Sequence, residues 1–257
     1  MIDHAPILEF DDNPTAIIEP SMWHNRIDGL PTAAVMTWMT DAYKRLISEY
    51  PSHVVHRFTA ESADVDIYQV ELAEGPVVAA LSHVGAPVAG ALYETLVAIG
   101  CSTLIAVGSS GGLVPEHPPG MVVVPDAAIR DEGVSYHYTP ASRLAHPDPG
   151  LQDALRSAFA ERDIDSVTGH LWTTDAFFRE TPAKVAARVN EGAIAVDMEA
   201  SALATIATFR GVRHGHAVYM ADTLHGDEWD PTELVRRDTD FRTQLLLTAA
   251  QTAAQHA

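Results

Sequence analysis

The chain has 257 residues, of which 47% are hydrophobic and 20% are charged. This length and composition predict one folded domain with a sizeable core and exclude a disordered or low-complexity protein. With 16 Lys and Arg against 35 Asp and Glu, the formal net charge is −19, which makes the chain a poor candidate for binding nucleic-acid backbones or anionic lipid.

Short β-branched runs alternate with helical patterns along the chain, which predicts an α/β domain built around a central sheet. The predicted strands are Thr15–Glu19, Val54–Thr59, Asp66–Glu71, Val77–Leu81, Leu104–Val107, Met121–Pro125, Val167–Leu171, Ile194–Val196 and His216–Ala221. The predicted helices are Thr32–Glu49, Val88–Ile99, Leu151–Arg162, Ala183–Asn190, Met198–Arg210 and Pro231–His256. Since no repeat or linker divides the chain, we expect a single domain over residues 1–257, with residues 1–14 as an extended N-terminal arm.

The N-terminus and the cysteine content favour a cytoplasmic protein. Residues 1–6 lack the charged, apolar and small-residue progression of a signal peptide. No apolar run reaches the ~20 residues of a membrane-spanning helix. The single cysteine, Cys101, excludes a disulfide framework.

A run of small residues, Gly108-Ser109-Ser110-Gly111-Gly112, follows the strand predicted over Leu104–Val107. As a turn, this run would let backbone N–H groups and two hydroxyls approach an anion or a sugar closely, although a plain tight turn explains it equally well. The run also fits G-x-S-x-G, the nucleophile elbow of α/β-hydrolases, which must open into a helix. Three prolines and a new predicted strand follow instead, so the elbow interpretation is rejected.

The segment 196–202 begins with Val196-Asp197-Met198-Glu199 and lies where a predicted strand gives way to a helix. Read alone, Asp197 caps the helix and Glu199 interacts favourably with the dipole of its first turn. Together with Val107–Leu113 and Gly120–Pro125, however, the segment resembles the nucleoside phosphorylase-I family. That family contains bacterial purine nucleoside phosphorylases, uridine phosphorylases and methylthioadenosine nucleosidases.

The resemblance covers residues 15–250 and implies a fold, an activity and a ribose site. It implies a central mixed, partly barrel-like β-sheet flanked by helices. The implied enzyme is a pentosyltransferase that cleaves a nucleoside with phosphate to give free base and ribose 1-phosphate. Glu199 and Met198 correspond to the ribose-binding residues, and a carboxylate suits this task because it only accepts hydrogen bonds and can hold two hydroxyls. His4 stands at about the spacing of a histidine that a neighbouring subunit places at the ribose 5′ end.

The resemblance assigns the base to Phe177 and Asp222. In the purine-cleaving branch the aspartate gives a proton to the leaving base at N7, which neutralises the charge that develops there. An arginine on the following helix, here Arg237, assists this transfer. The uracil-reading positions of uridine phosphorylases fall on Thr181 and Ala183, so the resemblance favours a purine.

The phosphate site matches the family least well. Ser109 and Gly108 correspond to the glycine turn, Arg57 to an arginine lent by the neighbouring subunit, and Arg26, with a one-residue shift, to an arginine of an N-terminal loop. The third arginine is replaced by Ala106. Two alternatives stay open for this reason: a nucleosidase that attacks with water, and a non-catalytic nucleoside-binding protein.

The resemblance implies no cofactor besides inorganic phosphate as co-substrate. It implies a homodimer or a hexamer of dimers whose sites are completed by the neighbouring subunit, with no nucleic-acid or membrane partner. No metal site is expected, because the thirteen histidines show no zinc spacing, and we expect His214 and His216 at the surface. Arg130-Asp131-Glu132 is expected to form a solvated face.

Overall fold

The computed structural model describes residues 5–61, 64–225, 229–236 and 238–257. Within this part of the chain one mixed sheet runs in the order β2-β3-β4-β1-β5-β11-β10-β7-β8, while β12 pairs with β5 and β6, and β6 pairs with β9. The strands are β1 (Ala33–Thr37), β2 (Ser52–Thr59), β3 (Asp64–Leu72), β4 (Gly75–Leu81), β5 (Thr103–Gly112), β6 (Val122–Val123), β7 (Ala127–Asp131), β8 (Leu144–Ala145), β9 (Ser166–Val167), β10 (His170–Thr174), β11 (Ala193–Asp197) and β12 (Arg213–Thr223).

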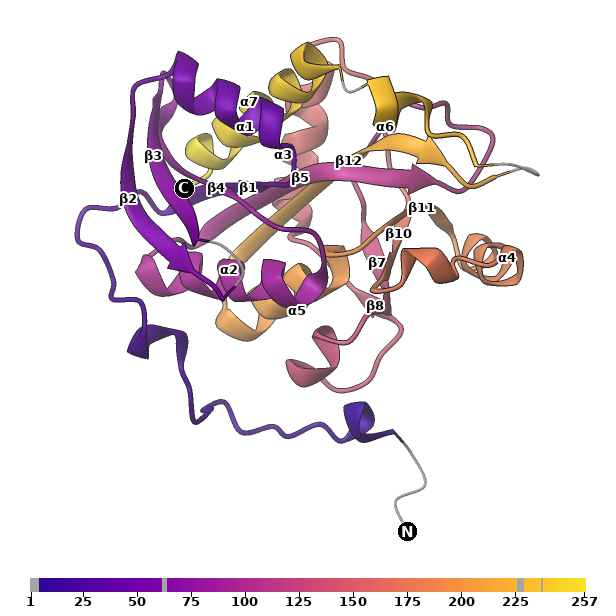
Figure 1. The fold of residues 1–257 in the computed structure, drawn as a ribbon, viewed down its shortest axis with the longest axis horizontal. Helices are drawn as coiled ribbons and strands as arrows, with labels where there is room; N and C mark the ends of the chain where they lie inside the picture. The colour runs from indigo at the N-terminus through magenta and orange to yellow at the C-terminus, as the bar shows by residue number, and fades with distance from the viewer. Residues whose placement is uncertain (1–4, 62–63, 226–228, 237) are drawn as a thin grey trace.

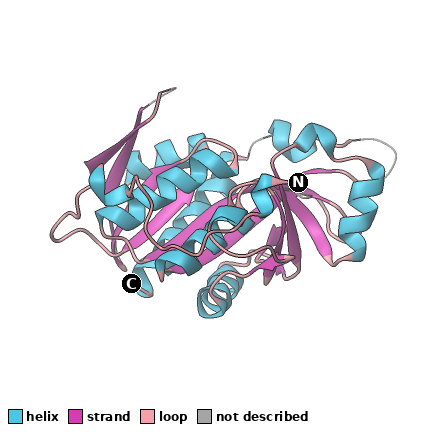
Figure 2. Ribbon diagram, turned by 90° about the horizontal axis from the view of Figure 1, so that it is seen from below, coloured by secondary structure: helices cyan, strands magenta, loops and turns pink. Residues whose placement is uncertain are grey.

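Helices cover both faces of this sheet (Figures 1 and 2). Helices α1, α3 and α7 pack together on one face, and α2 packs with α5 on the other. The helices are α1 (Thr40–Glu49), α2 (Ala86–Ile99), α3 (Pro149–Ala160), α4 (Pro182–Asn190), α5 (Ala200–Arg210), α6 (Thr232–Arg236) and α7 (Thr239–Gln255). The expected mixed sheet flanked by helices is therefore confirmed. None of the described helices is long and apolar enough to span a bilayer.

The central strands bury both of their faces. In β1, Ala33 and Val35 join the core under α1 and α7, whereas Ala34 and Met36 join the core under α2 and α5. A strand buried on both faces reads as a continuous apolar run rather than an alternating one. For this reason the helix predicted over Thr32–Glu49 is wrong in its first half, where β1 lies between β4 and β5.

Strand β5 brings the ends of three strands together. It pairs in parallel with β1 and with β12, and its last residues, Gly111 and Gly112, pair antiparallel with β11. The pairing of β12 with β5 continues as far as Thr223. The glycine-rich run is therefore the end of a long strand, and the expected turn at Gly108–Gly112 is wrong. The carboxyl ends of β5, β11 and β12 meet at one edge, which is where α/β folds place their ligands.

Other predicted elements differ in extent. Residues 5–31 contain two short 3-10 turns, Pro6–Leu8 and Pro20–Met22, and the strand predicted over Thr15–Glu19 does not form, because its backbone N–H groups bond nearby side chains instead of a ladder. The helix predicted over Pro231–His256 is divided into α6 and α7, since the carboxyl of Asp238 caps α7 by accepting the N–H of Phe241. Strands β7 and β8 were not predicted.

Candidate active site

A cavity of about 730 Å³ opens where β5, β11 and β12 end. Most of its lining is apolar, but four carboxyl groups face it, those of Glu180, Asp197, Glu199 and Asp222. The described residues that line it include no lysine, arginine or histidine. Five residues proposed from the sequence meet there: Ser109, Phe177, Met198, Glu199 and Asp222.

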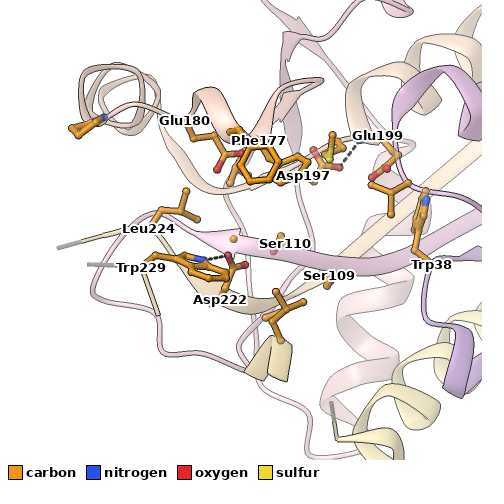
Figure 3. A pocket seen from close by; sticks show the side chains of 18 residues that line it. Trp38, Ser109, Ser110, Phe177, Glu180, Asp197, Glu199, Asp222, Leu224 and Trp229 are labelled. Atoms are coloured by element: carbon orange, nitrogen blue, oxygen red, sulfur yellow. Dashed lines mark hydrogen bonds between the residues drawn. The ribbon is translucent and has the colours of Figure 1, made fainter. Parts of the chain in front are cut away.

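The ribose carboxylate expected at Glu199 lies at one end of the cavity, beside Trp38 (Figure 3). Glu199 is only 7% exposed, and its Oε1 accepts the backbone N–H of Gly85. Burial, followed by the charge of Asp197, raises the pKa of Glu199 to about 8. Donors that reach Glu199 favour its charged form and lower this pKa, and the two hydroxyls of a ribose would be such donors.

Asp197 fixes the start of α5 beneath Glu199. Its Oδ2 accepts the backbone N–H groups of Glu199 at 3.2 Å and Ala200 at 2.7 Å, while its Oδ1 accepts the hydroxyl of Thr173 at 2.7 Å. Burial raises the pKa of Asp197 to about 6 even though these donors oppose the shift. The helix-capping role expected for Asp197 agrees with these bonds, and it orients the neighbouring Glu199.

A buried polar layer supports this corner. Glu132 accepts the hydroxyl of Ser201 at 2.9 Å and the backbone N–H of Val134 and Ser135. Arg130 donates to Ser135 at 2.9 Å. The solvated face expected at Arg130–Glu132 is therefore wrong, because Arg130 lies on the buried strand β7 and Glu132 directly follows it.

The other end of the cavity holds Phe177, Glu180, Asp222 and Trp229 (Figure 3). Asp222 Oδ2 accepts the indole N–H of Trp229 at 2.6 Å. Burial raises the pKa of Asp222, and the Trp229 bond opposes that rise. Phe177 is half-exposed at this end, so its ring is open to a flat ligand.

The glycines of the run 108–112 leave space in which other side chains pack closely against β5. A Cβ at Gly108 would lie 2.8 Å from Cε3 of Trp38, so the missing side chain lets the indole pack against β5 at the edge of the cavity. Ser110 donates its hydroxyl to the backbone oxygen of Tyr219 at 3.2 Å. Ser109 lines the cavity, and its side chain hydrogen-bonds no other described residue, so its hydroxyl is open to a ligand.

Neither Arg26 nor Arg57 lines the cavity of its own chain, and Arg57 is the arginine expected to reach the cavity of a neighbouring subunit. Arg57 lies on β2, whose hairpin with β3 projects from the body (Figure 2), and it pairs there with Asp66 at 2.6 Å. Arg26 packs over Gly100, next to the start of β5 and at the opposite end from the cavity. Ala106 is fully buried beside His216 of β12. His4 and Arg237 lie outside the described residues.

The two histidines of β12 are buried, so their expected surface position is wrong. His214 and His216 are each 2% exposed, because β12 is a central strand with both faces covered. Burial lowers the pKa of His216 to about 3 and that of His214 well below its ordinary value. His216 is therefore neutral, 3.6 Å from Asp197 Oδ2.

Trp38, Glu180 and Trp229 complete the cavity and were missed as site residues in the sequence. Each lies in a connection rather than in a motif: Trp38 between β1 and α1, Glu180 before α4, and Trp229 before α6. The aromatic type of the two tryptophans was the available signal, since exposed loop aromatics often serve binding.

Comparison with known proteins identifies the family. Residues 32–255 match the phosphorylase superfamily. The chain belongs to this superfamily. A uridine phosphorylase from Treponema pallidum is 31% identical over 159 residues, 58% of this chain and 62% of the relative. A guanosine phosphorylase from Halorubrum lacusprofundi is 29% identical over 132 residues, 51% of this chain and 55% of the relative. The chain thus spans less than two thirds of either relative.

A solved structure agrees over nearly the whole fold. The crystal structure of uridine phosphorylase from Vibrio fischeri superposes with a TM-score of 0.75 at 17% identity, covering 92% of this chain and 98% of the other. The resemblance to the nucleoside phosphorylase-I family that the sequence motifs indicated is therefore confirmed. The chain shares its fold with the Vibrio fischeri enzyme.

Proposed function

We propose that this protein cleaves the N-glycosidic bond of a nucleoside by phosphorolysis, giving free base and a pentose 1-phosphate. The observation that carries the proposal is the layout of one cavity. A buried carboxyl with its capping Asp197 lies at one end, and a ring with two carboxyls lies at the other. This separation matches the two halves of a nucleoside. The superfamily membership and the uridine and guanosine phosphorylases among the relatives support it.

At the ribose end, Glu199 would accept the two sugar hydroxyls and Met198 would pack against the sugar. Bond cleavage gives the sugar oxocarbenium character and pushes negative charge onto the base. A buried carboxylate below the sugar stabilises the positive charge electrostatically, more strongly than it would in water. Asp197 and the Gly85 N–H hold this carboxylate in place, so little reorganisation is needed.

At the base end, Phe177 would stack on the base and the Asp222 carboxyl would deliver a proton to it. Proton delivery of this kind is worth typically 10²–10⁴-fold in rate. A purine is favoured over a pyrimidine, because Thr181, one of the two positions that read uracil in uridine phosphorylases, uses its side chain to cap α4 by accepting the N–H of Lys184. Neither Thr181 nor Ala183 lines the cavity.

The phosphate would meet the hydroxyl of Ser109 and the end of β5. The cations that neutralise it must come from elsewhere, since the described lining carries none. Arg57, exposed on the projecting β2–β3 hairpin, is suited to reach the cavity of a second copy. We therefore propose a homodimer or a hexamer of dimers whose sites are shared between subunits.

Hydrolysis is the second candidate function, and one observation favours it. Ala106 stands where the family's phosphorylases carry an arginine, and its methyl group is fully buried. A cavity with four carboxyls and no cation in its described lining repels a phosphate dianion, whereas water meets no such barrier.

One experiment tests both candidates. Purified protein is incubated with a panel of purine and pyrimidine nucleosides, with and without phosphate, and the sugar product is identified. Pentose 1-phosphate formed only with phosphate supports phosphorolysis, and free pentose formed at equal rates in both conditions supports hydrolysis. If no nucleoside releases its base in either condition, the enzymatic proposal is wrong and a binding protein remains.

A further inference from the structure

Two carboxyl groups face each other at the base end of the cavity, those of Glu180 and Asp222 (Figure 3). Glu180 follows the 3-10 turn Phe177–Arg179, and Asp222 lies near the end of β12. Both side chains line this end of the cavity, and after burial the charge of Asp222 is the second cause that raises the pKa of Glu180. Two carboxylates in one largely apolar cavity disfavour each other's ionisation, so a proton is lost from such a pair at higher pH than from an isolated carboxyl in water.

The hydrogen-bond donors around Glu180 and Asp222 determine which of the two carboxyls holds a proton more readily. The indole N–H of Trp229 donates to Asp222 at 2.6 Å, and a donor stabilises the charged form of a carboxyl. Among the described residues, none donates a hydrogen bond to the side chain of Glu180. The Trp229 bond therefore favours ionisation of Asp222 relative to Glu180, which makes Glu180 the member of the pair that holds a proton more readily.

No cation in the described lining offsets the charge of the pair. The charged group that acts on Glu180 is Asp222, and the further one that acts on Asp222 is Asp230, which also disfavours ionisation. Arg179, the neighbour of Glu180 in the chain, is exposed and does not line the cavity. Within the described residues, the charges that act on the pair thus favour retention of a proton.

We propose that Glu180 is a second catalytic carboxyl, which together with Asp222 supplies the proton that the departing base takes up. This inference rests on the proposed function. As the C1′–N bond breaks, its electron pair moves onto the base, and the proton passes from the pair to a ring nitrogen. An oxygen of phosphate forms the new bond to C1′. The pair, now doubly ionised, takes a proton from water before the next turnover.

The acidity of the pair suits a reaction at neutral pH. Burial, followed by the charge of Asp222, raises the pKa of Glu180 to about 7. An acid works best when its pKa lies near the working pH, because it is then both present and able to release its proton. Activity should accordingly fall as the pH rises through about 7 and the pair loses its last proton.

The test compares Glu180→Gln with wild type across pH 5–8, at saturating phosphate and with the best nucleoside. The ratio of the two kcat/KM values cancels the titration of phosphate itself. We expect the variant to be about tenfold slower or worse at pH 7.5 and to approach wild type as the pH falls, because Asp222, whose pKa is raised by burial, can then supply the proton alone. Glu180→Asp should restore part of the activity at pH 7.5, because it restores a titrating carboxyl.

The controls separate a catalytic role from a structural one. Glu161→Gln, at the exposed end of α3, should match wild type at every pH. Because no described residue hydrogen-bonds the Glu180 side chain and glutamine carries no charge to bury, Glu180→Gln should unfold at or above the wild-type temperature at pH 7. A ratio that stays constant from pH 5 to 8 would overturn the inference while leaving the proposed function intact. Absence of base release by the wild type, with or without phosphate, would overturn both.

Discussion

Replacing Glu199 by glutamine should make the protein more stable and less active. The carboxyl is 7% exposed, and its pKa is raised to about 8, whereas in an unfolded chain it titrates near 4.5. The folded state therefore binds the proton more tightly, and wild-type stability declines as the pH rises from 4.5 to 8. At ~1.4 kcal/mol for each pH unit in this window, the loss at pH 7 reaches about 3 kcal/mol.

Glutamine removes this loss without removing the local hydrogen bond. Its side-chain oxygen can still accept the N–H of Gly85, and it carries no charge to bury. Glu199→Gln should therefore exceed wild type in unfolding free energy by up to about 3 kcal/mol at pH 7, with little difference at pH 4.5. The loss of a charged acceptor for the ribose hydroxyls should lower kcat/KM at least about tenfold.

The assay is urea unfolding at fixed protein concentration, followed by tryptophan fluorescence at pH 4.5 and pH 7. Glu161→Gln, an exposed control, should leave both midpoints unchanged. A stability difference of the same size at the two pH values would refute the reasoning, because burial of a titrating charge predicts a difference that grows with pH.

Three further substitutions test other parts of the structure. Asp222→Ala should lower turnover of a purine nucleoside at least about a hundredfold, and near wild-type turnover in a product assay would remove it from catalysis. Gly108→Ala places a Cβ 2.8 Å from Cε3 of Trp38, so the indole must shift and KM for the nucleoside should rise; an unchanged KM would contradict the contact. Arg210→Ala removes two N–H donors that lie 2.7 and 3.0 Å from the Glu94 carboxylate, a side chain that is 9% exposed. The substitution should reduce the unfolding free energy by about 1–3 kcal/mol. A urea midpoint equal to that of wild type would count against this ion pair.

The parts of the fold that were predictable are those where local pattern and tertiary environment agree. Helix α2 begins at a proline-containing first turn and ends at Gly100, and both signals lie within the segment itself. The sequence pattern predicts a helix where β1 forms, because Ala33-Ala34-Val35-Met36 has no alternation that would distinguish a doubly buried strand from a buried helix. Its strand character depends on pairing with β4 and β5, which lie far along the chain.

The same distinction applies to the candidate site. Glu199, Met198 and Ser109 lie in short motifs that carry their own context, and the cavity contains all three. Trp38, Glu180 and Trp229 reach the cavity from three separate loops, so their meeting depends on the packing of the whole domain. For Arg26 the residue type matches at nearly the expected spacing, but its side chain packs over Gly100, next to the start of β5, so spacing alone did not predict its position.

The central position of β5 has a consequence for the order in which the molecule opens. Its amides are shared between β1, β11 and β12, so they can exchange with deuterium only when the sheet comes apart. The segment that holds Trp229 and Leu234 is joined to the sheet at the Thr223–Asp230 bridge and by the packing of α6 against β12, and it presents both side chains to solvent. It should exchange through local opening, at a much smaller free-energy cost. Strand β5 and the segment that holds Trp229 and Leu234 therefore belong to different cooperative units. A bound nucleoside should slow amide exchange in the Trp229–Leu234 segment while leaving exchange in β5 unchanged.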